Sequence, residues 1–391
     1  MLGAFAPLSP LRERGWGRGR HPKGPGMVRR VRRAFGAPSP GADLPLMSVK
    51  TPQHVAVMGA GLAGCSVARS LALAGVSVTV VERAASIATG ASAAPRMVVR
   101  PWLTRQPTLA STLSRQAFEH AVAVYRNHPA WEACRVMQRS KPGEDPTRMV
   151  VALSEQHWPP TLMRPVGHDD DDPRWFDIAQ GGALNPRFWC ETELARPGIT
   201  VQLGRHATLT ELLDDHDAVV VACAGATPEV LGQAMPMSRT RGQTTTLKPG
   251  ALPDLTTVRC GDGYVAPLAH GAALVGASYD RDDDPTVRAE SHAENLARLQ
   301  RLTGATLTPD HIAEGWVGFR AAWPDRLPTV GPISADQRVW MAAGYASRGA
   351  VWAPLLGEVL AAGLLQTPAP LSRPLLEAMD PARLARWAGP S

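Results

Sequence analysis

A glycine-rich segment near residue 60 carries a chemistry that residue types and spacing alone can identify. It runs Gly59-Ala60-Gly61-Leu62-Ala63-Gly64, and Glu82 follows 23 residues after the first glycine. In this spacing the first glycine permits a tight turn, the second lets backbone N–H groups approach a pyrophosphate, and the third lets a helix pack closely on a strand. A carboxylate at this distance accepts hydrogen bonds from a ribose diol. The segment therefore predicts a dinucleotide site.

The flanking residues predict the elements that must position this segment. An apolar strand over 54–58 precedes the glycines, a helix follows to about Ala74 and ends at Gly75, and a second strand over 76–81 ends on Glu82. The amino end of such a helix offers partial positive charge to phosphates. Strand, turn, helix, strand and acid in one unit favour this interpretation over a glycine-rich turn in an unrelated α/β protein.

The later segments indicate which dinucleotide binds. A simple NAD dehydrogenase would continue directly with further strand–helix–strand units. Here the chain after Glu82 is irregular, with a helix-like run at 113–125, and a buried strand with a glycine turn returns only at 217–225. A sheet completed so late implies a second domain inserted between its halves. That layout is typical of glutathione-reductase-like flavoproteins, so FAD is the better prediction.

A series of different short motifs lies along the chain from about Val55 to Arg386. Besides the glycine segment with Glu82, they are Gly90-Ala91-Ser92, 181–186, 224–225, Arg241-Gly242-Gln243, 263–267, 276–279, 318–320, 325–331, 344–349 and 380–383. With these motifs the chain resembles the FAD-dependent amine oxidoreductases of the D-amino-acid oxidase type. Within that family it is most similar to the oxidase half of bifunctional tRNA-modification enzymes.

Two departures from that pattern affect the functional expectation. Only a short tail precedes the FAD motif, where the resemblance would place a methyltransferase half. The turn after Ser92 carries Ala93-Ala94-Pro95-Arg96-Met97, then Arg100-Pro101, in place of the family's usual Gly-Asn and a further glycine. This loop lies beside the flavin in relatives, so activity or substrate preference could differ here.

The resemblance also implies how a substrate would be held. The flavin performs the redox step, and the protein orients the amine so that its Cα–H faces flavin N5. Arg320 matches the arginine that grips the substrate carboxylate, and a guanidinium fork fixes such a group by two charge-assisted bonds. Tyr264 is expected to donate a further hydrogen bond, and Tyr279 is a weaker candidate. The alternatives are a surface salt bridge for Arg320 and a packed strand aromatic for Tyr264.

The remaining site residues are cofactor contacts implied by the same resemblance. They are Arg83, Gly90, Ser92, Gly225, Gly344, Ser347, Arg348 and Gly349. The last of them precede an apolar helix over 351–365, whose amino end would face the flavin pyrimidine and stabilise negative charge there. No HxxxH or HExxH spacing occurs, so no metal is expected.

We therefore expect an α/β fold, in which a glutathione-reductase-like FAD/NAD(P)-binding Rossmann domain carries an inserted antiparallel-sheet substrate domain. The FAD domain is predicted to span 47–130, 185–235 and 312–391, and the substrate domain 131–184 and 236–311. Residues 1–46 are a basic tail that we expect to be disordered, with Met47 as a candidate start.

Charge and cysteine content narrow the partners and the compartment. The 391 residues sum to +6, but the first 50 carry +8 and the remaining 341 carry −2. The basic character of the chain is therefore no evidence for RNA binding. Five widely spaced cysteines favour a reducing, cytoplasmic location. The sequence contains no run of about 18 consecutive apolar residues, so no membrane-spanning helix is predicted.

The function implied by the resemblance is oxidative cleavage on tRNA. The bond is the carboxymethylamino C–N bond of 5-carboxymethylaminomethyl-(2-thio)uridine at the wobble position, and glyoxylate is released. A separate methyltransferase would then be a partner, and neither a membrane nor DNA is expected to be one. Two alternatives stay open: a small-molecule oxidase of glycine, sarcosine or D-amino acids, and a non-catalytic FAD-binding protein.

Overall fold

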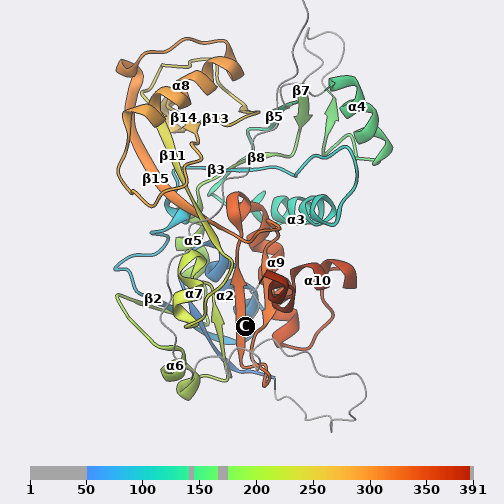
Figure 1. The fold of residues 1–391 in the computed structure, drawn as a ribbon, viewed down its shortest axis with the longest axis vertical. Coiled ribbons are helices and arrows are strands. Elements are labelled where there is room, and N and C mark those ends of the chain that lie inside the picture. The colour runs from blue at the N-terminus through green and yellow to red at the C-terminus, as the bar shows by residue number, and fades with distance from the viewer. Residues whose placement is uncertain (1–50, 141–144, 166–174, 388–391) are drawn as a thin grey trace, which may run out of the picture.

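Three β-sheets organise the computed structural model, which describes residues 51–140, 145–165 and 175–387. The basic tail over 1–46 lies outside the described residues. Figure 1 shows a six-stranded sheet and most of its helices at one end of the molecule, and an eight-stranded sheet at the other. Among the described residues no helix is long and apolar enough to cross a bilayer.

The six-stranded sheet contains the predicted glycine unit. Its strand order is β16-β17-β10-β1-β2-β9, and all neighbours are parallel except β16 with β17. The strands are β1 His54–Met58, β2 Ser77–Glu82, β9 Ile199–Leu203, β10 Ala218–Val221, β16 Thr329–Pro332 and β17 Val339–Ala343. The central strands are apolar and buried, as a sheet covered on both faces requires. The strand predicted at 217–225 thus lies beside β1, far from it in sequence.

Helices pack around this sheet. They are α2 Leu62–Leu73, α3 Leu109–Tyr125, α5 Pro186–Leu194, α6 Leu209–Asp215, α7 Thr227–Val230, α9 Gly349–Leu364 and α10 Arg373–Met379. The predicted helices at 62–74, 113–125 and 351–365 correspond to α2, α3 and α9. The α2 helix ends before Gly75, whose φ of +84° stops it. The Tyr125 hydroxyl on α3 donates to the Ala350 carbonyl at 2.8 Å and so ties α3 to α9.

The eight-stranded sheet has the order β15-β11-β14-β13-β12-β5-β7-β6. Its strands are β5 Val136–Arg139, β6 Arg164–Pro165, β7 Trp175–Ile178, β11 Ser238–Leu247, β12 Val258–Cys260, β13 Tyr264–Pro267, β14 Ala273–Gly276 and β15 Ile312–Ala322. Every pairing is antiparallel except that of β12 with β5. Helix α8 Ala289–Thr303 packs on β11, β13 and β14. A parallel sheet beside a largely antiparallel one confirms the predicted fold class.

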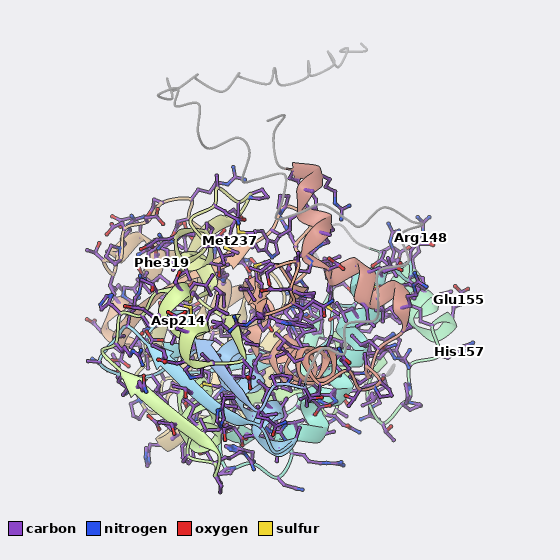
Figure 2. The ribbon with its side chains drawn as sticks, turned by 90° about the horizontal axis from the view of Figure 1, so that it is seen from below. Arg148, Glu155, His157, Asp214, Met237 and Phe319 are labelled. Carbon is purple, nitrogen blue, oxygen red and sulfur yellow. The ribbon has the colours of Figure 1, made fainter. Side chains whose placement is uncertain are left out.

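Two smaller features complete the layout. Strands β3 Met97–Val99, β8 Gly182–Leu184 and β4 Trp131–Glu132 form a third sheet. Helix α4 Pro146–Glu155 stands on the side of the molecule away from Phe319 of β15 (Figure 2).

Strand β15 bears on where the two domains meet. It is hydrogen-bonded along its length to β11, with Thr240 opposite Arg320. The predicted division puts residues 312–322 with the FAD domain, although their sheet partner is in the other domain. We propose that the last FAD-domain segment begins after β15, and the other boundaries stay predictions.

Candidate active site

A cavity of about 380 Å³ opens where the parallel strands of the six-stranded sheet end. The segments that follow β1 and β10 line one side of it, together with the end of β17 and residues 344–351, and parts of β11, β13 and β15 line another. Ligands of open α/β sheets bind at this carboxyl edge of the strands. The predicted site residues that line the cavity are Gly61, Leu62, Ala63, Ser92, Tyr264, Tyr279, Arg320, Gly344, Ser347, Arg348 and Gly349.

The other predicted residues do not line the cavity. Gly59 and Ala60 lie in the turn beside it, Gly64 in the first turn of α2, and Glu82 at the end of β2. The Arg83 side chain is 60% exposed and lies 4.0 Å from the carboxylate of exposed Glu229. Gly90 and Gly225 are also outside the lining.

The glycine turn is held in the shape that its residue types predict. Gly59 has φ +105°, and a Cβ there would lie 2.7 Å from the Ala222 carbonyl oxygen. A Cβ on Gly64 would lie 1.9 Å from the Gly59 carbonyl oxygen. The carboxylate of Glu82 accepts from the backbone N–H of Ala60 and of Ala84, both at 2.9 Å. The acid is therefore fixed against the turn, at the end of β2.

Two helix amino ends reach the cavity with no cap from their own N-cap residue, although the Ser92 hydroxyl accepts from the Leu62 N–H of α2 at 3.0 Å. These are α2 after Gly61 and α9 after Arg348. Gly349 lines the cavity, and a Cβ there would have only Leu62 Cδ1 near it, at 3.7 Å, so the space beside the start of α9 is open. Uncapped N–H groups favour anionic or electron-rich partners. This arrangement fits FAD: the amino end of α2 would hold the pyrophosphate, and the amino end of α9 would face the flavin.

Arg320 of β15 brings a positive charge into the same cavity. Its Nη1 donates to the Ser278 carbonyl at 3.1 Å and to the Arg241 carbonyl at 3.4 Å. Its Cζ lies 4.3 Å from the centre of the Tyr279 ring. Within the described residues no carboxylate pairs with Arg320, and its Nε and Nη2 donate to no protein atom. The guanidinium can therefore offer two parallel donors to a ligand.

The two tyrosines differ in their surroundings. Burial raises the pKa of Tyr264 on β13 to about 12, although Arg320 acts in the opposite direction, so the phenol stays a hydrogen-bond donor. Tyr279 is 60% exposed, and its hydroxyl lies 3.2 Å from Ser347 Oγ. Desolvation would raise the pKa of Tyr279, but Arg320, the Ser347 hydrogen bond and two further arginines lower it below its ordinary value.

Two arginines that were not predicted as site residues also line the cavity, beside the predicted Arg348. Arg96 and Arg100 come from the loop that departs from the family pattern. Burial, with the charge of Arg100, lowers the pKa of Arg348 to about 9, and its Cζ lies 4.8 Å from the Trp102 ring centre. Asp262 is the one acid among the lining residues. The excess of arginines over acids in the lining favours an anionic ligand. In the sequence, the unusual loop was the only indication of Arg96 and Arg100 at this site.

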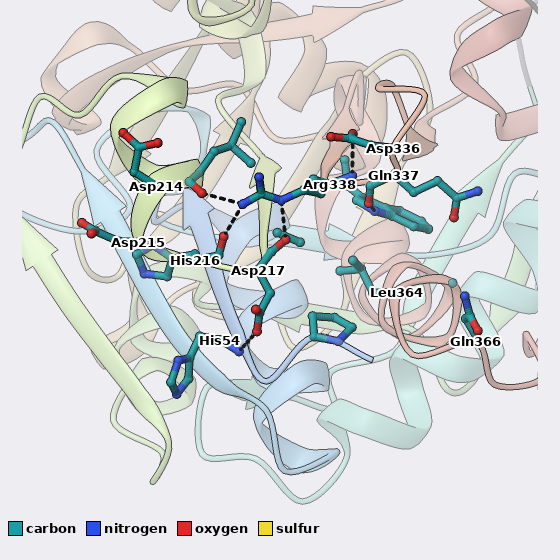
Figure 3. Close-up of a pocket in the computed structure, with 15 residues that line it drawn as sticks. His54, Asp214, Asp215, His216, Asp217, Asp336, Gln337, Arg338, Leu364 and Gln366 are labelled. Atoms are coloured by element: carbon teal, nitrogen blue, oxygen red, sulfur yellow. Dashed lines mark hydrogen bonds between the residues drawn. The ribbon is translucent and has the colours of Figure 1, made fainter. Parts of the chain in front are cut away.

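A second hollow, of about 430 Å³, lies at the opposite, amino edge of the parallel strands (Figure 3). There Arg338 donates to the carbonyls of His216 at 2.8 Å and Asp217 at 3.0 Å. The Asp217 carboxylate accepts from the backbone N–H of Gln53 and His54. These polar groups hold strand and helix ends together, which is a structural role, so the hollow is not our candidate site.

Sequence comparison places the chain among known proteins. The family model described as FAD dependent oxidoreductase matches residues 54–363. The chain is 39% identical over 369 residues to the tRNA 5-methylaminomethyl-2-thiouridine biosynthesis bifunctional protein MnmC of Thiobacillus denitrificans, covering 85% of this chain and 60% of the relative. It is 35% identical to the protein of that name from Burkholderia thailandensis, covering 84% and 59%. The chain thus spans about three fifths of the length of these curated relatives.

Solved structures share the fold at lower identity. Iminodiacetate oxidase from Chelativorans sp. BNC1 aligns with a TM-score of 0.68 and 20% identity over 84% of this chain and 98% of that chain. Glycine oxidase from Geobacillus kaustophilus aligns with a TM-score of 0.65 and 17% identity over 83% and 97%. At these identities the comparison shows the fold alone.

Proposed function

This chain belongs to the family of FAD dependent oxidoreductases, and we propose that it cleaves the carboxymethylamino C–N bond of 5-carboxymethylaminomethyl-(2-thio)uridine at the tRNA wobble position. The observation that carries the proposal is the Arg320 guanidinium, which lines the cavity with no carboxylate partner among the described residues. A carboxymethylamine supplies that missing carboxylate. The curated relatives are named for the biosynthesis of 5-methylaminomethyl-2-thiouridine in tRNA, and the proposed cleavage would be an earlier step in making that nucleoside.

The cofactor is FAD, and we propose which of the described residues would bind each part of it. The turn Gly59–Gly61 and the amino end of α2 would hold the pyrophosphate, and Glu82 the ribose. Residues 347–349 and the amino end of α9 would lie against the flavin. When bound, FAD accepts a hydride from the substrate Cα, and hydrolysis of the resulting imine releases glyoxylate and leaves a primary amine.

Residues of the second sheet would orient the substrate. The Arg320 Nε and Nη2 would take the two carboxylate oxygens, and the Tyr264 hydroxyl would donate to one of them. Two points of attachment fix the direction of the Cα–H bond, which is the main contribution a protein can make here. The positive cavity lining also favours the neutral form of the substrate amine, which is the form able to lose the hydride.

Partners and location follow from the same proposal. The product amine would need a methyl group to match the nucleoside for which the relatives are named, so we propose a methyltransferase as a functional partner. Modified tRNA is a cytoplasmic substrate in this proposal, and the protein is therefore placed in the cytoplasm. Net charge does not argue for tRNA, because residues beyond 50 sum to −2.

A substrate comparison tests the function. The FAD-loaded protein is mixed anaerobically with tRNA carrying the carboxymethylaminomethyl group, and separately with glycine, sarcosine and D-alanine, while flavin bleaching and glyoxylate are measured. We expect bleaching and stoichiometric glyoxylate with the tRNA. Bleaching by a free amino acid but not by tRNA would replace this function with that of a small-molecule oxidase. No bleaching by any substrate would favour a non-catalytic FAD-binding protein.

A further inference from the structure

Arg241 on β11 is a charged residue that the mechanism above leaves unused. Its side chain is fully buried, next to the cavity but outside its lining. Burying a guanidinium is costly unless its donors are paired with good geometry. The partners of Arg241 therefore show which part of the structure this buried charge holds in place.

All three nitrogens of the Arg241 guanidinium are bonded. Nη1 donates to Asp280 Oδ2 at 2.7 Å and lies 3.5 Å from Ser291 Oγ. Nη2 donates to Gln243 Oε1 at 2.9 Å and to the Thr286 carbonyl, and Nε donates to the Asp284 carbonyl at 2.8 Å. Three of these five partners lie in the loop 277–288, which joins β14 to α8.

The loop is also tied to β11 through its backbone. Arg241 and Asp280 exchange both N–H···O bonds, at 3.0 and 3.1 Å. Asp280 Oδ2 accepts a second bond from the Ser278 hydroxyl at 2.7 Å, and that hydroxyl accepts from the Gln243 N–H at 3.0 Å. The start of the loop is thus fixed by a buried charge pair and by strand-like bonds together.

This fixed part of the loop supplies the immediate surroundings of Arg320. The Ser278 carbonyl accepts from Arg320 Nη1, and the Tyr279 ring lies against its guanidinium. The Arg241 carbonyl also accepts from Arg320 Nη1. Both hydrogen-bond acceptors of the Arg320 guanidinium, and the ring stacked on it, therefore come from Arg241 or from the loop residues next to Asp280.

Resting on the carboxylate clamp of the proposed function, we propose that Arg241, Asp280 and Ser278 are positioning residues that hold the Arg320 guanidinium in line for a substrate carboxylate. They act through Arg320 and touch neither substrate nor cofactor. Asp280 supplies the charge that pairs Arg241, and Ser278 transmits the position of Asp280 to the carbonyl under Arg320. We expect loss of either to shift Arg320, together with the Tyr279 ring stacked on it, and so to weaken carboxylate binding.

The test is a ligand titration of the FAD-loaded full chain. Glycolate, a small carboxylate that resembles the carboxymethyl arm, is added while the flavin absorbance spectrum is followed. We expect Asp280→Asn to raise the glycolate dissociation constant about 10-fold, because it removes the charge that pairs with the buried Arg241 guanidinium. We expect Ser278→Ala to raise it about 3-fold, because the hydroxyl bonds of Ser278 are lost while the Arg241–Asp280 pair remains. In the Arg320→Ala background the same changes should have no further effect.

Asp282→Asn is the matched control. Asp282 lies in the same loop, but it pairs with Arg288 at the surface, with Nη–Oδ distances of 2.8 and 3.0 Å, and has no bond to Arg241 or Ser278. Its glycolate binding should stay within about 2-fold of the parent, since exposed pairs contribute little.

Several results would overturn the proposal. They are equal weakening by Asp280→Asn and Asp282→Asn, unchanged binding in a folded Asp280→Asn protein, and no spectral response of the parent to glycolate. If Asp280→Asn does not fold, Ser278→Ala decides in the same way. Glycolate binding that follows these expectations while tRNA is not turned over would refute the proposed function and leave the positioning roles standing.

Discussion

At the scale of single residues, the site depends on where a few polar groups stand relative to one guanidinium. Arg320 is half-buried, stacked on Tyr279, and bonded to two carbonyls by one nitrogen only. Its other donors are therefore available to a ligand. The predicted partner Tyr264 lines the same cavity, and its raised pKa keeps it a donor.

Tyr264→Phe should weaken substrate binding more than it slows the chemistry. One hydrogen bond to a charged oxygen is lost, so we expect KM to rise about 10-fold with kcat nearly unchanged. Because burial raises the pKa of Tyr264 to about 12, the KM of the parent should show no loss of this donor between pH 6 and 10. Steady-state kinetics across that range check both points, and a fall in kcat at constant KM would contradict the assigned role.

Gly242 leaves the space in which the Arg320 guanidinium lies. A Cβ at residue 242 would stand 2.4 Å from both Nη atoms. Gly242→Ala should therefore displace the end of a flexible side chain, reduce carboxylate affinity about 10-fold or more, and change stability by less than about 1.5 kcal/mol. Glycolate titration and urea unfolding measure the two effects separately. Unchanged affinity would show that Arg320 does not need this position.

At the scale of elements, two helix amino ends and the edge of one sheet meet at the cavity. Helices α2 and α9 pack on each other, and neither is capped there by the side chain of its own N-cap residue. The long pair β11 and β15 brings Arg320 to the same place, with Gly242 opposite Gly318 in the register. The site is therefore built where elements end, from parts that are rigid behind it.

Gly349→Ala should distinguish an effect on folding from an effect on cofactor binding at the amino end of α9. The added Cβ meets nothing closer than 3.7 Å in the protein, so the helix should form and the melting temperature without FAD should change little. If the flavin lies against this helix end, FAD affinity should fall about 10-fold or more, as measured by flavin fluorescence. Gly64→Ala is the contrasting variant, since its Cβ would lie 1.9 Å from a backbone oxygen and should disturb the fold itself. Full FAD affinity in Gly349→Ala would place the flavin elsewhere.

At the scale of the whole molecule, stability should fall on mild acidification. Burial lowers the pKa of His128 and of His292 below the ordinary value of about 6.5. As the pH falls, the unfolded chain takes up protons on these histidines before the folded chain does. Their contribution to the free energy of unfolding is therefore complete above about pH 6.5 and is lost as the pH falls below it. Unfolding by urea at pH 7.5 and 5.5 should show the lower midpoint at pH 5.5.

His292→Gln tests one source of that dependence. His292 Nδ1 lies 2.8 Å from Thr245 Oγ1, where α8 packs on β11. Glutamine can keep a hydrogen bond to Thr245 but takes up no proton in this range. The midpoint difference between the two pH values should therefore shrink in the variant. An undiminished difference would assign the acid sensitivity to other groups.

The sequence by itself determined the glycine unit and its neighbours. Strand β1, the turn at Gly59, helix α2 and strand β2 lie where spacing predicted them, because each depends on interactions within a short stretch of chain. Short apolar runs, a glycine with positive φ and a helix stop at Gly75 are local properties that residue types specify. FAD as cofactor and the fold class followed from that unit and from the late return of the parallel sheet.

Only the tertiary structure decided how the proposed carboxylate-binding half of the cavity is assembled. Arg320, Gly242, Ser278 and Tyr264 come from four separate segments, and they meet because of the register of β11 with β15 and of β13 with β14. The pairing of β13 with β14 is a local hairpin, but β11 and β15 pair residues some 80 positions apart, and that register depends on how whole sheets pack. The same reason explains why Arg241, a motif residue with no role predicted from sequence, has its partners and its proposed role only in three dimensions.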